Sequence, residues 1–223
     1  ENRHSEKLIL SANEIIKSPG IPESSSIIQL IRKKGIKIIS EIEFAARFTD
    51  AKKICITGSN GKTTTTSLIQ HMMRKAGLNV GMAGNIGRSF AYQVATENYD
   101  YYVLEISSFQ LDGMYDFKAD IAILLNITPD HLDRYDYNLQ SYVDSKFRIT
   151  QNLTEDEFFV FCSDDEITIK ELEKIVSKAR QLPYAYHKKE DDVAWVDHEE
   201  FMRIEFDDVD FSMSVNELAL KGR

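Results

Sequence analysis

The chain alternates short apolar runs with segments whose apolar residues recur at helical spacing. Continuous apolar runs bounded by turn residues are typical of buried strands, and they occupy residues 52–57, 78–82, 100–106, 119–127 and 157–162. Helical periodicity predicts helices over residues 62–76, 88–96, 138–151 and 165–180. Strands that alternate with helices are typical of βαβ units. The predicted fold class is therefore α/β, with a mostly parallel, doubly wound sheet.

The two ends of the chain follow other patterns. Near the C-terminus, "FMRIEF", "VDFSMSV" and "LALKGR" are short alternating segments separated by turns, which predict an antiparallel β extension. Near the N-terminus, a turn-rich "SPGIPESS" precedes a helix over 25–34, a strand over 36–40 and a second helix that Ser40 and Glu43 begin with capping-box spacing.

The first fifty residues are too few to bury a core of their own. We therefore expect residues 1–49 to be the C-terminal part of an N-terminal, Rossmann-like domain. Residues 50–223 are expected to form a second domain, with a P-loop-type sheet that is incomplete at its C-terminus. Both domains are expected to continue in a longer protein.

Composition narrows the class of protein. The 223 residues carry a net charge of −9, which disfavours non-specific binding to a nucleic-acid backbone. The sequence has no apolar run of about 18 residues that would predict a membrane span, and its N-terminus has no signal-peptide apolar core. The two cysteines, Cys55 and Cys162, lie in strand-like runs and are expected to be buried, reduced thiols. These features predict a cytoplasmic protein.

The stretch "ICITGSNGKTTTTSLIQ" has the composition of a phosphate-binding loop but not the usual glycine spacing. The common template requires a glycine at position 56, which holds Ile56, and the nearest glycine is Gly58. A helix N-terminus after a strand still presents free N–H groups to a phosphate. Lys62 would reach the outer phosphates and the Thr63 hydroxyl would face a magnesium ion. The alternative is an ordinary glycine turn before a helix.

Two further residues stand where strands end. Glu105 ends the run "YYVLE", where a magnesium ligand would lie beside a phosphate loop. His131 follows the run "ILLNI" in "ITPDHLDRY". The alternatives are a carboxylate that caps the next turn and a solvated loop histidine.

Lys146 occupies an unusual place on its predicted helix. On a helical wheel it falls about 20° from Leu139, among Tyr142, Val143 and Phe147. A buried lysine is costly unless it is paired or neutral, and burial lowers its pKa, which makes the free amine available for covalent chemistry. The alternative is a lysine that keeps its stem on the core edge and its head in water.

Five strings occur here in the order and approximate spacing of the Mur ligases, which they resemble: "ITGSNGKTTTTSL", "GNIG", "VLEISSFQLD", "NITPDHLDRY" and "YVDSKFRI". The resemblance covers most of residues 13–165. "SPGIP", "SSFQL" and "HLDRY" resemble the branch that adds D-glutamate more than the other branches. The terminal "LKGR" is similar to the start of the family's Leu-Lys-Gly-x-His-Asn segment.

The resemblance implies an ATP-dependent amide ligase of peptidoglycan precursor synthesis. Such an enzyme phosphorylates the carboxylate of UDP-N-acetylmuramoyl-L-alanine, and the amine of D-glutamate then attacks the acyl phosphate. The implied partners are therefore small molecules, and a monomer is expected. Two rival hypotheses are another amide ligase of the superfamily, either diaminopimelate-adding or folylpolyglutamate synthase-like, and a non-catalytic nucleotide-binding module.

The resemblance also implies roles for individual residues. Lys62, His131 and Lys146 would be catalytic. Thr63 and Glu105 would hold one magnesium ion, and His131 would hold a second together with Lys146 as a carbamate. ATP would be bound by Gly58, Ser59, Asn60, Gly61, Lys62, Thr63 and Thr64, and the substrate by Ser18, Pro19, Gly20 and Asn85.

Overall fold

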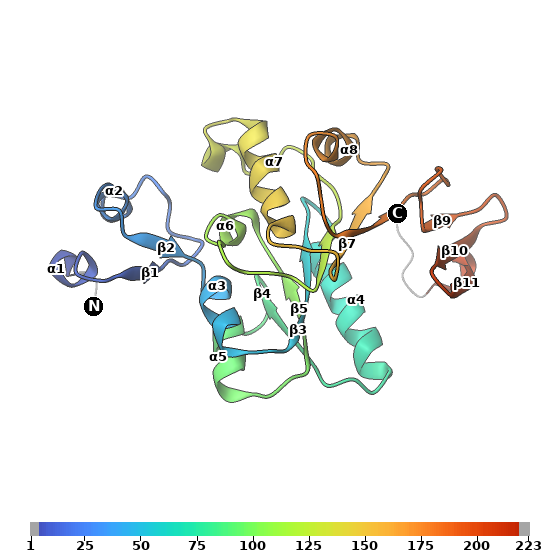
Figure 1. Cartoon of the computed structure of the whole chain (residues 1–223), viewed down its shortest axis with the longest axis horizontal. Coiled ribbons are helices and arrows are strands. Elements are labelled where there is room, and N and C mark those ends of the chain that lie inside the picture. Colours follow the sequence, from blue (N-terminus) through green and yellow to red (C-terminus); the bar gives the residue numbers. More distant parts are fainter. Residues whose placement is uncertain (1–4, 219–223) are drawn as a thin grey trace.

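The computed structural model describes residues 5–218, and its main feature is a nine-stranded sheet with the strand order β11-β10-β9-β8-β7-β6-β3-β5-β4 (Figure 1). Every pairing from β4 to β9 is parallel, and β9, β10 and β11 pair antiparallel. The prediction of a mostly parallel α/β sheet with an antiparallel extension is confirmed. The strands are β3 (Lys52–Thr57), β4 (Val80–Gly84), β5 (Tyr101–Glu105), β6 (Ile121–Leu124), β7 (Phe158–Cys162), β8 (Arg180–Tyr184), β9 (Ala194–Val196), β10 (Phe201–Phe206) and β11 (Val209–Ser214).

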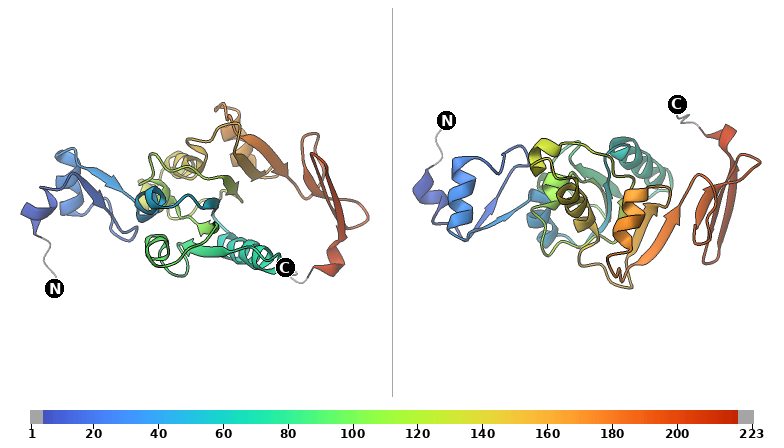
Figure 2. Two further views of the ribbon diagram at one scale, coloured as in Figure 1. Left: turned by 60° about the horizontal axis from the view of Figure 1, so that its bottom comes forward. Right: turned by 90° about the horizontal axis from the view of Figure 1, so that it is seen from above.

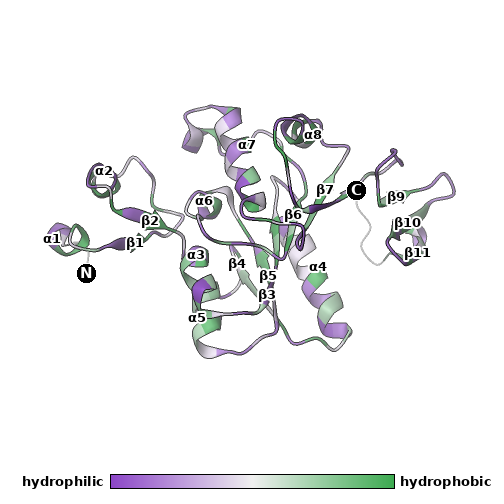
Figure 3. Ribbon diagram, in the orientation of Figure 1, coloured by the Kyte–Doolittle hydropathy of each residue, from purple (hydrophilic) through white to green (hydrophobic). Residues whose placement is uncertain are grey.

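Helices cover both faces of this sheet unequally. One face packs against α4 (Lys62–Lys75), where Ile54 and Ile56 contact Ile69 and Met73. The other face forms the main core, with Cys55, Leu104 and Phe159 fully buried. Figure 3 shows the hydrophobic colouring on the central strands. The helices on this second face are α3 (Glu41–Ala45), α5 (Phe90–Thr96), α6 (Ser108–Leu111), α7 (Leu139–Phe147) and α8 (Glu166–Leu172).

The strand order places a topological switch point at the carboxyl end of β3. The connection from β3 to β4 runs one way along the sheet, and the connection from β5 to β6 runs the other way. Open parallel sheets bind ligands where their connections diverge in this manner. β3, which lies between β5 and β6, therefore delivers its loop to the expected binding point.

The N-terminal residues form a separate small layer, drawn in blue in Figure 1. Strands β1 (Glu14–Ile16) and β2 (Lys37–Ile39) pair in parallel, and α2 (Ser26–Lys33) connects them as a βαβ unit; a short α1 (Glu6–Ile9) precedes them. Contrary to the expectation that this part has no core of its own, Ile28, Ile31 and Ile38 are buried together in a small separate cluster. Figure 2 shows this layer at one end of the molecule and the β10–β11 hairpin at the other.

The C-terminal third differs from the sequence predictions. The helix expected over 165–180 ends at Leu172, and Val176 beyond it is 97% exposed. Arg180 begins β8, a strand that the apolar pattern did not indicate, and β9 was also missed. The segments "FMRIEF" and "VDFSMSV" form the expected hairpin, whereas "LKGR" lies outside the described residues. Cys162 is half-buried rather than fully buried, and both cysteines are free.

Glu43 fastens the N-terminal part of the chain to the main core. Ser40 accepts the expected hydrogen bond from the Glu43 N–H, but the Glu43 carboxylate does not return to Ser40. Its oxygens accept from the backbone N–H groups of Tyr115, Asp116 and Phe117 at 3.1, 3.1 and 2.9 Å. Only half of the capping box therefore forms, because the buried carboxylate has three other donors.

Replacing Glu43 with alanine is expected to lower the free energy of unfolding by about 3 kcal/mol, because one buried and two partly buried N–H groups lose their carboxylate acceptor. Chemical denaturation measures the change. Glu155→Ala, at an exposed position, is the control and should stay within about 0.5 kcal/mol of the parent protein. A Glu43→Ala protein as stable as this control would contradict the anchoring role.

Candidate nucleotide-binding site

The loop between β3 and α4 explains the displaced glycine. Ile56 is fully buried in the sheet, so the turn begins only at Gly58, which has φ +152°. A Cβ atom at Gly58 would lie 3.0 Å from the Leu125 Cβ, so only glycine fits there without displacement. Gly61 is the N-cap of α4 and has φ +84°. The loop therefore meets the geometric requirements of a phosphate cradle at a helix N-terminus, with its first glycine two positions late.

The segment after β6 fixes the backbone of this loop through hydrogen bonds. The Ser59 N–H donates to the Asn126 carbonyl at 2.9 Å, and the Asn60 N–H donates to the Asn126 side-chain oxygen at 2.9 Å. The Ser59 hydroxyl donates to the Thr128 carbonyl at 2.9 Å and lies 3.1 Å from the Tyr142 hydroxyl. Ser59 and Asn60, which the sequence analysis expects to bind ATP, stabilise the loop itself in this structure.

Two lysines converge on one backbone oxygen. The Lys62 ammonium group donates to the carbonyls of Gly58 and Ser59, both at 2.9 Å. The Lys146 ammonium group donates to the same Gly58 carbonyl at 2.8 Å. This contact joins α7 to the phosphate loop across 88 residues of sequence. The two lysines therefore lie side by side at this carbonyl, and their predicted roles at a shared site stay a prediction.

Lys146 is as buried as its place on the helical wheel predicted, with 2% of its surface exposed. Its ammonium group lies 4.7 Å from the centre of the Tyr142 ring. Burial, assisted by the positive charge of Lys62, lowers the pKa of Lys146 to about 7, while Asp130 acts in the opposite direction. A large fraction of this amine is therefore neutral near pH 7. Arg148, two residues further along, begins a short 3-10 turn and donates to the Leu111 carbonyl.

Thr63, Glu105 and Asn85 form a compact polar group beside the loop. The Thr63 hydroxyl donates to one Glu105 oxygen at 2.6 Å, and the Asn85 amide donates to the other at 2.9 Å. Glu105 is 1% exposed at the end of β5. Gly84 permits this approach, since a Cβ there would lie 2.1 Å from the Glu105 carbonyl oxygen. Asn85, predicted to contact substrate, here orients the carboxylate, and Thr64 is exposed on the first turn of α4.

His131 stands apart from this polar group. It is 58% exposed in side chain, has φ +50°, and its imidazole lies 3.5 Å from Asp130 and 5.6 Å from the Phe109 ring centre. Within residues 5–218, no three residues among His, Cys, Asp and Glu are grouped so that they could hold a metal ion. Of the four predicted metal ligands, the structure brings Thr63 and Glu105 into contact and leaves His131 on a neighbouring turn.

Ser18, Pro19 and Gly20 form a turn at the seam between the N-terminal layer and the main sheet. The Ile21 N–H donates to the Ser18 carbonyl at 3.1 Å, and Arg134 reaches the Pro19 carbonyl at 3.2 Å. A cavity of about 360 Å³ lies at this seam, and its lining includes Lys17, Arg32, Phe109, Asp112, Arg134 and Tyr135.

Three residues of this region were missed by sequence reasoning. Asn126, Tyr142 and Arg134 all make contacts that shape the site. A signal was present for Asn126, because it is the polar residue that directly follows the apolar run of β6. Tyr142 falls on the apolar side of the helical wheel, and nothing in the sequence singles out its hydroxyl.

Comparison with known proteins agrees with this geometry. The model of the Mur ligase middle domain matches residues 56–221. The UDP-N-acetylmuramoylalanine–D-glutamate ligase of Bacteroides fragilis is 57% identical over 223 residues, which are 100% of this chain and 50% of that protein. The same enzyme of Porphyromonas gingivalis is 50% identical over 223 residues, with the same coverage. The chain spans about half the length of the curated relatives it matches.

Solved structures share the fold at low sequence identity. A UDP-N-acetylmuramoyl-L-alanyl-D-glutamate–2,6-diaminopimelate ligase superimposes with a TM-score of 0.61 and 17% identity, over 91% of this chain and 55% of that one. MurF ligase from Thermotoga maritima in complex with ADP gives a TM-score of 0.52 and 18% identity, over 92% and 58%. None of the described helices has the length and apolar character needed to cross a bilayer.

The lowered pKa of Lys146 predicts a pH-dependent stability. Unfolded lysine keeps its proton to about pH 10.4, whereas folded Lys146 releases it at about 7, so the unfolded state binds more protons between these values. Stability should therefore rise with pH across this window. Lys146→Met should remove that rise and be the more stable protein at pH 6, by on the order of 4 kcal/mol before the lost Gly58 hydrogen bond is deducted.

Denaturation at pH 6, 8 and 9.5 in carbon-dioxide-free buffer measures this difference. Lys170→Met, on an exposed face of α8, is the matched control and should follow the parent protein at every pH. A stability difference between Lys146→Met and the parent that stays constant over the three pH values would show that the amine titrates normally.

Proposed function

The chain belongs to the Mur ligase family, and on that premise we propose that it is part of an ATP-dependent ligase that joins D-glutamate to UDP-N-acetylmuramoyl-L-alanine. The observation that carries the proposal is 57% identity, along the whole chain, with a UDP-N-acetylmuramoylalanine–D-glutamate ligase. The convergence of Lys62, Lys146, Thr63 and Glu105 on one glycine loop supports it, because this arrangement suits phosphoryl transfer.

The loop would bind the phosphates of ATP through residues Gly58 to Thr64. The free N–H groups at the start of α4 and the helix dipole favour negative charge there. The Lys62 ammonium group donates hydrogen bonds to the Gly58 and Ser59 carbonyls in the structure. With ATP bound, it would donate to a phosphate oxygen instead. A positive charge at that point stabilises the charge that develops as the terminal phosphoryl group moves.

The proposed reaction has two steps. A carboxylate oxygen of UDP-N-acetylmuramoyl-L-alanine attacks the terminal phosphorus of ATP, which forms an acyl phosphate and releases ADP. The amine of D-glutamate then attacks the acyl carbon, phosphate leaves, and the nitrogen loses a proton to give the amide. We propose that the exposed Asn85 contacts the UDP substrate near its reacting end. The Ser18–Gly20 turn is proposed to contact the uridine nucleotide of the same substrate.

Magnesium fits the oxygen donors beside the loop. The Thr63 hydroxyl and the Glu105 carboxylate are hard ligands, and they are already within 2.6 Å of each other. Magnesium would neutralise phosphate charge during transfer. For a second ion we propose His131 and Lys146, the latter as a carbamate, since carbon dioxide adds only to a neutral amine and the pKa of Lys146 is about 7.

Three broader expectations remain part of the proposal. Residues 1–49 are proposed as the end of the uridine-nucleotide domain and 50–223 as the ATP-binding domain, although α3 already packs on α5 of the main core. A monomer in the cytoplasm is also proposed. A ligase for another amino acid and a non-catalytic module are the rival functions, and substrate turnover distinguishes all three.

Turnover of the full-length protein tests the function. Incorporation of labelled D-glutamate into UDP-N-acetylmuramoyl-L-alanine should require ATP and should exceed incorporation of meso-diaminopimelate. Lys62→Met should lose at least about a hundredfold in kcat, because a transition-state charge partner is removed, while Lys170→Met should keep full activity. A preference for meso-diaminopimelate, or no turnover of either amino acid, would refute the assignment.

The carbamate at Lys146 has its own test. Protein equilibrated with carbon-13 bicarbonate should show a carbamate resonance by NMR that Lys146→Ala lacks, and Lys146→Ala should lose most ligase activity. Full, bicarbonate-independent activity in that variant would contradict the carbamate role even where D-glutamate specificity holds.

A further inference from the structure

Arg134 makes two contacts that join distant parts of the chain. It lies in the 3-10 turn Leu132–Tyr135, directly after His131. One guanidinium N–H donates to the Pro19 carbonyl at 3.2 Å, across 115 residues of sequence. The face of the same guanidinium lies 4.4 Å from the centre of the Phe109 ring, within the range of a cation–π contact.

Phe109 in turn belongs to an aromatic cluster, defined here as Phe109, His131 and Tyr135. The Tyr135 ring stacks on Phe109 with centres 6.0 Å apart, and the His131 ring lies 5.6 Å away. The Tyr135 hydroxyl donates to the Ser145 hydroxyl at 3.1 Å, and Ser145 precedes Lys146 on α7. The cluster is thus connected through Tyr135 to the helix that carries Lys146.

These contacts form a continuous path from the Pro19 turn to the phosphate loop. Arg134 connects Pro19 to the aromatic cluster, Tyr135 connects the cluster to α7, and Lys146 connects α7 to the Gly58 carbonyl. The 360 Å³ cavity lies beside the first of these steps and is lined by Arg134, Phe109 and Tyr135. A ligand in this cavity would therefore lie beside the end of the path that holds the Pro19 turn.

We propose that Arg134 is a positioning residue that fixes the Ser18–Gly20 turn against the aromatic cluster, and so sets where a uridine-nucleotide substrate lies relative to the phosphate loop. This inference rests on the proposed function for its substrate, but the contact itself does not. Arginine suits the task because its planar group can stack on a ring and donate a hydrogen bond at the same time. Lysine can make either contact but lacks the planar fork.

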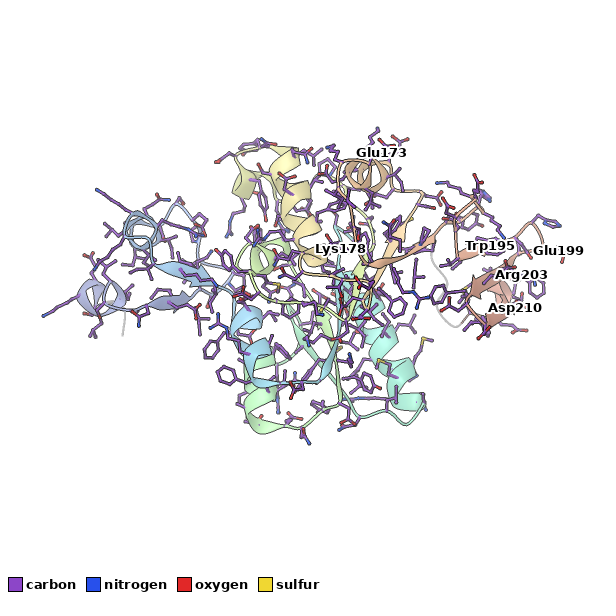
Figure 4. All side chains as sticks on the ribbon, in the orientation of Figure 1. Glu173, Lys178, Trp195, Glu199, Arg203 and Asp210 are labelled. Carbon is purple, nitrogen blue, oxygen red and sulfur yellow. The ribbon has the colours of Figure 1, made fainter. Side chains whose placement is uncertain are left out.

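The first experiment measures the turn without any substrate. Hydrogen–deuterium exchange of the full-length, ligand-free protein should be faster over residues 17–23 in Arg134→Ala, by about tenfold if one hydrogen bond and one cation–π contact are lost. Arg203→Ala is the matched control. Arg203 also stacks on a ring, Phe201 at 5.4 Å, and binds Asp197 at 2.8 Å, but it lies on β10 at the far end of the sheet (Figure 4).

The second experiment measures steady-state ligase kinetics on the same proteins. Arg134→Ala should raise the KM for the UDP substrate about tenfold and leave the KM for ATP within about twofold, with Arg134→Lys in between. Arg203→Ala should change neither value. An unchanged KM for the UDP substrate, or an equal rise in both KM values, would overturn the positioning role.

The two experiments separate the two hypotheses. Faster exchange over residues 17–23 in Arg134→Ala, in a protein that turns over no substrate, would support the Arg134 contact and refute the proposed ligase function. Normal exchange in Arg134→Ala together with normal kinetics in an active ligase would refute the inference and retain the function. Exchange that is faster throughout the protein would show a general loss of stability and would also refute it.

Discussion

The carbonyl oxygen of Gly58 is the point on which the arrangement of this site depends. It accepts hydrogen bonds from Lys62 on α4 and from Lys146 on α7, at 2.9 and 2.8 Å. Two ammonium groups that share one neutral acceptor repel each other, which is why the charge of Lys62 contributes to the low pKa of Lys146. Positive charge at the carboxyl end of β3 therefore comes mainly from Lys62 and the N-terminus of α4. An anion is what this positive charge is suited to hold.

The glycine spacing of the loop follows from the same contact. Because Ile56 is needed in the sheet core, the chain cannot turn before Gly58, and the turn then places the Gly58 carbonyl between the two lysines. Asn126 and Ser59 stabilise this backbone from the side of β6. The first glycine is thus two positions later than in the common template, but the loop still ends in a phosphate cradle at a helix N-terminus.

Much of this was predictable from the sequence where the local pattern and the tertiary structure agree. The parallel strands, the loop and the buried side of Lys146 follow from apolar runs and helical period. The Ser40–Glu43 spacing predicted a reciprocal cap, but the buried Glu43 carboxylate is satisfied by the N–H groups of residues 115–117, which no local signal announces.

The missed strand β8 has a different physical reason. Its sequence "RQLPY" lacks alternation and contains Pro183, which argues against a central strand. The Pro183 carbonyl accepts from Val193, so its missing N–H faces the β9 side, where the ladder is a single pair, Tyr184 with Ala194. Proline is tolerated there because hardly any hydrogen bond is lost.

The sequence predicts where the turn after β6 lies, but it does not predict the backbone conformation of that turn. His131, Asp136 and Tyr137 all have φ between +50° and +57°, a conformation that costs energy outside glycine. Packing of Tyr135 on Phe109 and Tyr142, and of Arg134 on Phe109, stabilises this backbone from distant parts of the chain. The orientation of His131 is therefore a property of the aromatic packing around it. Because that packing also reaches Pro19 and Ser145, the positions of the Ser18–Gly20 turn and of α7 are determined jointly.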